Sequence, residues 1–99
     1  LYGAFHRIVP VAPRAGAEPV RCDVVGPVCE TSDTLGLDRL LPDPQPGDLL
    51  AILDTGAYGA VMASTYNRRP LAPEVLVDRG EWRLVRRRQS VEDLLACEL

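Results

Sequence analysis

A thiol and a carboxylate stand side by side at Cys29 and Glu30, shortly after a strand-like stretch that Gly26-Pro27 brings to an end. This position places two groups that can transfer protons on a loop, where functional sites are often built. A neighbouring carboxylate disfavours the thiolate, so the pair favours a proton-donating thiol over a nucleophilic one. On local sequence alone, the alternative is a small buried cysteine next to a solvated glutamate.

A second segment that could do chemistry is Gly56-Ala57-Tyr58-Gly59, at the junction between a predicted strand and a predicted helix. Glycines at such a junction let backbone amides approach an anion, and the start of a helix favours negative charge. Tyr58 can add a hydroxyl donor to a phosphate. The pattern is neither a P-loop nor a dinucleotide fingerprint, and a turn with a core tyrosine is the alternative.

Three further features have simple structural interpretations. His6 follows Tyr2 by four residues; a lone histidine is usually structural, although a thiol hydrolase could pair His6 with Cys29 as base and nucleophile. The basic run Arg86-Arg87-Arg88 is typical of a solvated face, with contact to an acidic partner as the alternative. The segment 67–70, which reads Asn-Arg-Arg-Pro, indicates a helix stop followed by a turn.

Composition limits the class of protein. The 99 residues suffice for one domain, and 46% apolar with 25% charged residues is ordinary globular composition. A net charge of −3 argues against a nucleic-acid binder. No run approaches the roughly 18 apolar residues of a membrane helix. The three cysteines lack paired metal spacing, so we predict no metal site and expect reduced thiols in the cytoplasm.

The sequence lacks lysine and an initial methionine. The chain contains no lysine, so all eleven of its basic residues other than histidine are arginine. It begins at Leu1 without a methionine. We therefore expect a piece of a longer protein with a substantial part upstream.

The elements that must position these residues are mostly strands. Alternation of apolar and polar residues and turn signals predict four to six strands and two short helices. The expected strands are Phe5–Val11 with Pro10 at an edge, Val20–Val25, a buried strand within Asp48–Asp54, and a hairpin over Glu74–Val85. The expected helical segments are a short turn at Leu35–Leu41, a helix at Ala57–Tyr66, and a last helix at Val91–Cys97 that opens with a Ser90-Asp93 capping box.

The hairpin prediction includes a register. A two-residue loop at Arg79-Gly80 places Val77 opposite Trp82, and Val75 opposite Leu84, on one face. The same register sets two acidic residues, at positions 78 and 81, against each other, which is unfavourable, so a longer loop remains open.

Taken together, the motifs resemble the C-terminal β-domain of the fold-type III, pyridoxal-phosphate-dependent decarboxylases, the family that acts on ornithine, arginine and diaminopimelate. They follow the order and spacing of the family over nearly all of residues 1–99, and the ordered set displaces the alternatives given above for Cys29, Glu30 and Tyr58. The matching segments are 1–6 (LYGAFH), 26–33 (GPVCETSD), 56–67 (GAYGAVMASTYN), 69–70 (RP) and 73–76 (PEVL).

The resemblance implies roles for single residues. Tyr58 is similar to the tyrosine that hydrogen-bonds the cofactor phosphate and lies at the substrate. Cys29 resembles the cysteine that crosses the dimer interface and donates a proton after carbon dioxide leaves. Glu30 resembles the acid that meets the distal ammonium of diaminopimelate, whereas ornithine-type relatives usually have aspartate there. Tyr2 resembles a tyrosine that helps to hold the distal carboxylate of the substrate.

The loop departs from the usual family pattern at one position. That pattern commonly reads Glu-Ser-Gly-Asp after the cysteine, whereas this chain has Ser32 in place of the glycine. Loss of a glycine restricts the backbone of a loop.

The resemblance also implies a fold and a reaction. The fold is mainly β, a β-sandwich or Greek-key barrel-like domain with one or two short helices, and it lacks the N-terminal α/β (TIM-like) barrel. The cofactor is pyridoxal 5'-phosphate, and its Schiff-base lysine lies outside this chain. The implied reaction converts meso-2,6-diaminopimelate to L-lysine and carbon dioxide in a cytoplasmic enzyme.

The implied partners are the small-molecule substrate, the N-terminal barrel of the same protein and a second copy in a homodimer. Cys29 and Glu30 would serve the partner's site, and Tyr58 the site of its own chain. Two alternatives remain open: a decarboxylase of the ornithine, arginine or carboxynorspermidine type, and a decarboxylase-like regulatory module without catalysis. The isolated domain is expected to be inactive and to expose apolar surface.

Overall fold

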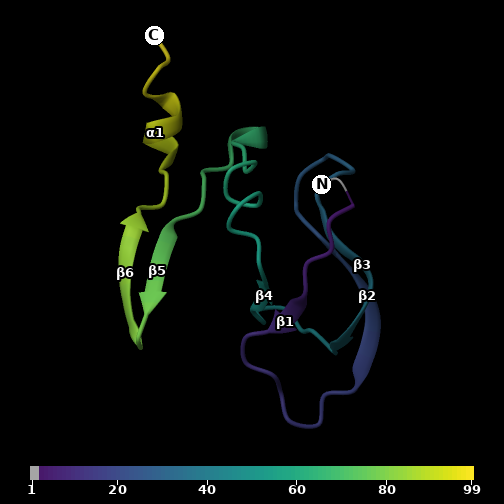
Figure 1. Ribbon diagram of the computed structural model, residues 1–99. Coiled ribbons are helices and arrows are strands. Elements are labelled where there is room, and N and C mark those ends of the chain that lie inside the picture. Colours follow the sequence, from purple (N-terminus) through teal and green to yellow (C-terminus); the bar gives the residue numbers. More distant parts are fainter. Residues whose placement is uncertain (1–2) are drawn as a thin grey trace. The chain divides into compact units, whose positions relative to one another are not determined.

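The computed structural model describes residues 3–99 and divides the chain into two compact units, one ending at Val61 and one running from Met62 to Leu99. In both units the regular secondary structure is mainly antiparallel strands with little helix (Figure 1), so the mainly β class predicted from the sequence is confirmed. The first unit contains β1 (Ile8–Pro10), β2 (Pro19–Val25), β3 (Thr34–Pro42) and β4 (Leu50–Ile52). The second unit contains the 3-10 turn η1 (Tyr66–Arg68), β5 (Glu74–Asp78), β6 (Glu81–Arg86) and α1 (Val91–Leu95). Within these described residues, no helix has the length and apolar content needed to span a membrane.

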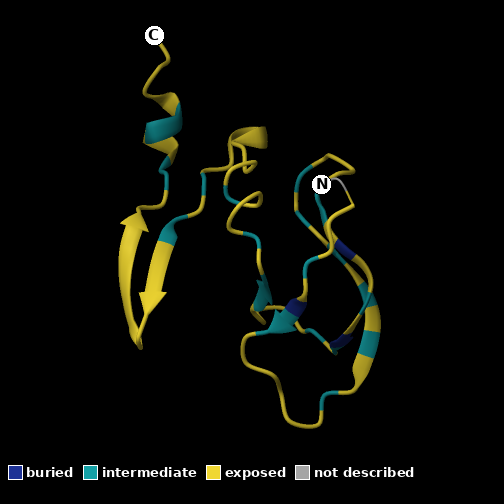
Figure 2. Cartoon of the chain, in the orientation of Figure 1, coloured by how far each residue is buried: buried dark blue, intermediate teal, exposed yellow. Residues whose placement is uncertain are grey.

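The first unit is built from two antiparallel strand pairs, β1 with β4 and β2 with β3. Ile8 pairs with Ile52 in the first sheet. Ile8 and Leu41 are the only large apolar side chains that are buried in residues 3–99. Most of the chain is coloured as exposed or intermediate in Figure 2, so the core of this unit is small. Pro10 lies in a strand with a single neighbour, as its missing N–H group requires.

β3 is a nine-residue strand, so the helical turn predicted over Leu35–Leu41 is wrong. Its pairing with β2 shifts twice, between Cys22 and Val24 and between Val24 and Val25. Each shift inserts one extra residue on β3, which is a β-bulge. A bulge interrupts the alternation of the two faces of a strand. The leucines of β3 therefore do not keep a two-residue period along the whole strand.

The first bulge is held by a side chain of β2. Asp38 adopts a φ of 50°, and its N–H donates a hydrogen bond to Oδ1 of Asp23 at 2.8 Å. Bulges bend and twist a strand pair and often lie beside functional sites. Here both bulges lie close to the loop 26–33, which joins β2 to β3.

Arg39 links β3 to the segment that leads into β1. Its Nη1 donates to the carbonyl oxygen of His6 at 2.7 Å, and its guanidinium carbon lies 4.0 Å from the centroid of the Phe5 ring. A guanidinium over an aromatic ring is an attractive arrangement. A Cβ atom at Gly36 would lie 2.8 Å from Nε of Arg39. Glycine at position 36 therefore leaves room for this link between the two strand pairs.

The segment after β4 forms turns, so the helix predicted over Ala57–Tyr66 is wrong. One helical turn closes at its start, where the carbonyl oxygen of Thr55 accepts the N–H groups of Gly59 at 2.6 Å and Ala60 at 3.3 Å. A Cβ atom at position 59 would lie 2.6 Å from that oxygen, so only glycine fits. Glycine also makes a continuing helix unfavourable because it has the most backbone freedom to lose.

The second unit confirms the register predicted for the hairpin. Val77 pairs with Trp82 and Val75 pairs with Leu84 across β5 and β6. All four side chains are exposed, and Val77 and Trp82 are each 72% exposed. A contiguous exposed apolar face of this kind marks an interaction surface.

The hairpin loop consists of two residues only, so the longer loop is not formed. Arg79 and Gly80 have φ values of 52° and 78°. Positive φ at both positions defines a type I′ turn, whose twist matches that of the paired strands. Asp78 and Glu81 stand opposite each other as a result, and both are exposed to solvent, which screens their repulsion.

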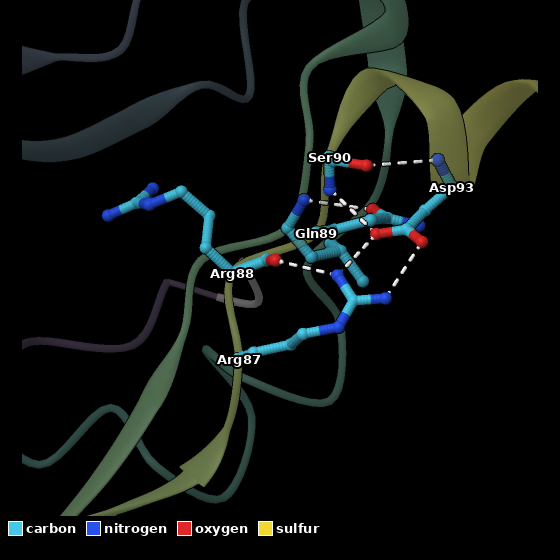
Figure 3. Close-up of polar contacts among 6 residues, drawn as sticks. Arg87, Arg88, Gln89, Ser90 and Asp93 are labelled. Carbon is cyan, nitrogen blue, oxygen red and sulfur yellow. Dashed lines mark hydrogen bonds and ion pairs between the residues drawn. The ribbon is translucent and has the colours of Figure 1, made fainter.

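The short helix α1 is fixed at its start by polar contacts (Figure 3). The Ser90 hydroxyl accepts the N–H of Asp93 at 3.2 Å, and the Asp93 carboxylate accepts the N–H of Ser90 at 2.8 Å. The predicted capping box is therefore confirmed.

Arg87 donates to both carboxylate oxygens of Asp93, at 2.6 and 2.8 Å. These bonds, first of all those from Arg87, hold the pKa of Asp93 below its ordinary value. The helix ends at Leu95, earlier than predicted.

The contact between Arg87 and Asp93 predicts a pH-dependent opening of α1. The pKa of Asp93 is lowered in the folded chain, so the stabilisation is present above the ordinary value of 3.8 and is lost as the pH falls below it. Arg87→Gln should raise amide hydrogen exchange across residues 90–97 at neutral pH by up to about fivefold. The difference from the unmodified protein should shrink as the pH falls below 3.8.

Arg88→Gln is the matched control, because the Arg88 guanidinium has no ion pair among the described residues. Hydrogen exchange followed by mass spectrometry, corrected for intrinsic rates, measures both variants. Equal protection of α1 in the Arg87 and Arg88 variants would contradict the assigned contact.

Candidate functional site

The loop 26–33 carries the thiol and the carboxylate singled out in the sequence. The N–H of Gly26 donates to the carbonyl oxygen of Asp33 at 2.8 Å, which holds the two ends of the loop together. Cys29 and Glu30 are both exposed between these ends. Their predicted position on a loop is confirmed, and the exposure of Cys29 contradicts the alternative of a buried cysteine, while the roles of both residues remain predictions.

Asp33, at the end of the loop, forms hydrogen bonds with the backbone of two other loop residues. Its Oδ2 accepts the N–H of Val28 at 3.0 Å, and its own N–H donates to the carbonyl oxygen of Glu30 at 3.1 Å. The carboxylate lies directly over Gly26, where a Cβ atom would be 2.0 Å from each of its oxygens. The sequence assigned no role to Asp33, although this residue matches the aspartate of the family pattern and lies at the end of the loop opposite a glycine.

Glu30 is partly engaged by its own loop. Its Oε2 accepts the N–H of Ser32 at 3.0 Å and also the Ser32 hydroxyl, and its Oε1 accepts the Thr31 hydroxyl at 3.4 Å. An ionised carboxylate has about four acceptor positions, so this exposed group can still accept from a cation. Ser32 is not among the residues with positive φ. The loop therefore makes no use of the conformational freedom that a glycine would give there.

Tyr58 lies in the turn that follows β4. It is 73% exposed, which contradicts the alternative of a core tyrosine. Its hydroxyl has no hydrogen-bond partner in the part of the chain that the structure describes. A phenol that is open to solvent can donate to an oxyanion such as phosphate, so the predicted chemistry is available at this position.

His6 has a structural contact. Its Nδ1 lies 3.0 Å from the carbonyl oxygen of Leu53, next to the bond from the Leu53 N–H to the carbonyl of Arg7 at 2.9 Å. These contacts join the ends of β1 and β4 and support the structural interpretation over a pairing with Cys29. Tyr2, the fourth predicted site residue, lies outside the described residues.

Arginines of the two basic segments form ion pairs within the second unit. Arg86 pairs with Glu74 at 2.9 Å, and Arg68 pairs with Glu98 at 2.6 Å. All four of these side chains are substantially exposed to solvent. The exposure of Arg86 fits the solvated face predicted for the run 86–88, and the two ion pairs within the unit were not predicted.

Comparison with known proteins gives a consistent result. Residues 1–56 match the family described as pyridoxal-dependent decarboxylase, C-terminal sheet domain. The diaminopimelate decarboxylase of Neisseria meningitidis is 52% identical over 99 residues, which are 100% of this chain and 24% of that protein. The diaminopimelate decarboxylase of Archaeoglobus fulgidus is 48% identical over 96 residues, 96% of this chain and 23% of that protein.

Solved structures agree with these relatives. A crystal structure of diaminopimelate decarboxylase from Helicobacter pylori complexed with L-lysine is similar with a TM-score of 0.88 at 45% identity, covering 98% of this chain and 24% of that one. A diaminopimelate decarboxylase from M. jannaschi gives a TM-score of 0.90 at 37% identity, covering 100% of this chain and 22% of that one. The chain thus spans about a quarter of the length of the relatives that it matches.

Proposed function

Because the chain belongs to the family of pyridoxal-dependent decarboxylases, as its C-terminal sheet domain, we propose that it is part of an enzyme that converts meso-2,6-diaminopimelate to L-lysine and carbon dioxide. The observation that carries this proposal is the 52% identity over all 99 residues to a relative named for that activity. A similar solved enzyme was crystallised with L-lysine, the product of the proposed reaction. The exposed Cys29-Glu30 loop adds a proton donor and an ammonium-binding group of suitable chemistry.

The proposed enzyme needs parts outside these 99 residues. The sequence contains no lysine, and the resemblance places the lysine that anchors the cofactor in an N-terminal barrel. Two exposed features support further contacts, namely the apolar face of the β5–β6 hairpin and the loop 26–33. We propose that the barrel of the same protein and a second subunit provide those contacts, in a cytoplasmic homodimer.

Residues of this chain would bind the phosphate of the cofactor and donate one proton during the reaction. Pyridoxal phosphate, when bound, supplies the electron sink that makes loss of carbon dioxide possible. The Tyr58 hydroxyl donates a hydrogen bond to its phosphate, which the exposure of this side chain permits. The Sγ–H of Cys29 donates a proton to the carbon from which carbon dioxide has left. The thiol can do this because it lies on an exposed loop and not in the core.

Substrate recognition is assigned to the two remaining site residues. Glu30 binds the distal ammonium of the substrate, since a carboxylate and an ammonium form a charge-assisted hydrogen bond. Tyr2 assists at the distal carboxylate. As the family resemblance implies, Cys29 and Glu30 would serve the site of the partner subunit, and Tyr58 would serve the site of its own chain.

A substrate panel on the full-length protein tests the proposal. With pyridoxal phosphate present, we expect kcat/KM for meso-2,6-diaminopimelate to exceed the values for ornithine and arginine by about 100-fold or more, measured as released carbon dioxide and lysine. Preference for ornithine, arginine or carboxynorspermidine would identify a related decarboxylase instead. Cofactor binding without turnover of any of these substrates would favour the regulatory module.

A further inference from the structure

We propose that Asp33 is the positioning residue for Cys29, and that it acts by bonding the chain on both sides of the thiol. Its Oδ2 accepts the N–H of Val28, at 3.0 Å, and its N–H donates to the carbonyl oxygen of Glu30, at 3.1 Å. The residue before the cysteine and the residue after it are therefore both tied to a single aspartate. This inference rests on the proposed role of Cys29 as proton donor.

Gly26 provides the space that the Asp33 carboxylate occupies. The Asp33 carboxylate occupies the space of a side chain at position 26, because a Cβ atom there would lie 2.0 Å from both oxygens and 2.2 Å from Cγ. Gly26 does not have a positive φ. The glycine is thus explained by the close approach of the carboxylate rather than by its backbone conformation, and any larger residue would displace Asp33 from the Val28 N–H.

Within the described chain, hydrogen bonds rather than core packing shape this loop. None of residues 26–33 is buried within the described chain. The bond from the Thr34 hydroxyl to the Thr31 carbonyl at 3.0 Å and the bonds from Ser32 to Glu30 shape only the second half of the loop. A reacting group displaced by about 1 Å can lose about 100-fold in rate. The bonds of Asp33 to Val28 and Glu30 are therefore expected to control proton delivery from Cys29.

Kinetics of variants of the full-length protein test this proposal. Asp33→Ala should lower kcat about 10- to 100-fold, because the thiol loses its fixed position. Asp33→Asn keeps an oxygen that can accept the Val28 N–H, so it should stay within about fivefold of the unmodified protein. Asp43→Ala is the matched control, since the exposed Asp43 carboxylate has no hydrogen bond or ion pair in the described chain.

A double variant tests the contact with Gly26. Gly26→Ala alone should lower kcat about as much as Asp33→Ala, because its Cβ and the carboxylate cannot coexist. In the Asp33→Ala protein the same glycine change should add little, since the clashing group is gone; such non-additivity is the mark of direct contact. Additive losses would overturn the proposal, as would an Asp33→Ala protein with unchanged kcat or an Asp33→Asn protein as slow as Asp33→Ala.

A readout that does not need turnover separates this proposal from the proposed function. Alkylation of Cys29 by iodoacetamide, resolved by peptide mapping, should be about fivefold faster in Asp33→Ala than in the unmodified protein, a change that the loss of one hydrogen bond allows. Unchanged alkylation would overturn the positioning role. A protein that fails to decarboxylate any substrate but shows this change would remove the proposed function and keep the loop assignment.

Discussion

In the full-length enzyme, Cys29→Ala is expected to lower kcat for meso-2,6-diaminopimelate about 100- to 10,000-fold, the range that a positioned proton donor contributes. Alanine removes the Sγ–H but leaves the backbone contacts of Asp33 to Val28 and Glu30 in place. Tyr58 is not altered, so the affinity for pyridoxal phosphate should stay the same. Steady-state kinetics and an absorbance titration of the cofactor measure the two effects separately.

Cys97→Ala is the matched control for this experiment. Cys97 is exposed like Cys29 but follows α1 at the other end of the chain. Its replacement should leave kcat unchanged. Equal turnover of the Cys29→Ala enzyme and the unmodified enzyme would remove Cys29 from the mechanism.

The second large effect is expected for Glu30→Gln, which should lower kcat/KM for meso-2,6-diaminopimelate about 10- to 150-fold, the range for a hydrogen bond to a charged group. Glutamine is the same size and can still accept the N–H of Ser32. It lacks the negative charge that binds the distal ammonium. The loss should appear mainly in KM, measured by initial rates over a range of substrate concentrations.

Glu18→Gln controls for the loss of one negative charge from the same unit. The Glu18 side chain is exposed and makes no ion pair within the described residues. Its replacement should leave kcat/KM unchanged. If the Glu30 and Glu18 variants behave alike, Glu30 does not bind the substrate.

Local sequence signals predicted the hairpin and the capping box of the second unit. The hairpin register follows from alternation in β5 and β6 and from a glycine at the turn, and the structure has the predicted pairs. The capping box follows from a serine three residues before an aspartate, and both of its bonds are present. In each case the residues that decide the conformation lie within a few positions of one another, so the sequence contains the whole cause.

Two segments, β3 and the turn after β4, could not be predicted in this way. The bulges of β3 depend on pairing with β2, including the bond from Asp38 to Asp23 fifteen positions away. The turn after β4 depends on how closely Gly59 approaches Thr55. The helical predictions at both places are wrong because the local sequence shows neither the partner strand of β3 nor the space around Gly59.

In the candidate site, too, the sequence predicted the local features but not a contact between residues at the two ends of a loop. The ordered motifs pointed to Cys29, Glu30 and Tyr58, and the structure places all three on exposed turns and loops. The contact of Asp33 with Gly26 was not predicted, because glycine after a strand is a sufficient stop signal by itself. In the structure, the Asp33 side chain fills the space beside Gly26.

The exposed face of the β5–β6 hairpin also gives the chain an optical reporter. Trp82 is the only tryptophan in the 99 residues and stands on that face, largely in contact with water. An indole in water fluoresces at longer wavelength than an indole covered by protein. Any surface that covers the hairpin will therefore shift the emission of this chain to shorter wavelength, so that its assembly can be followed without an attached dye.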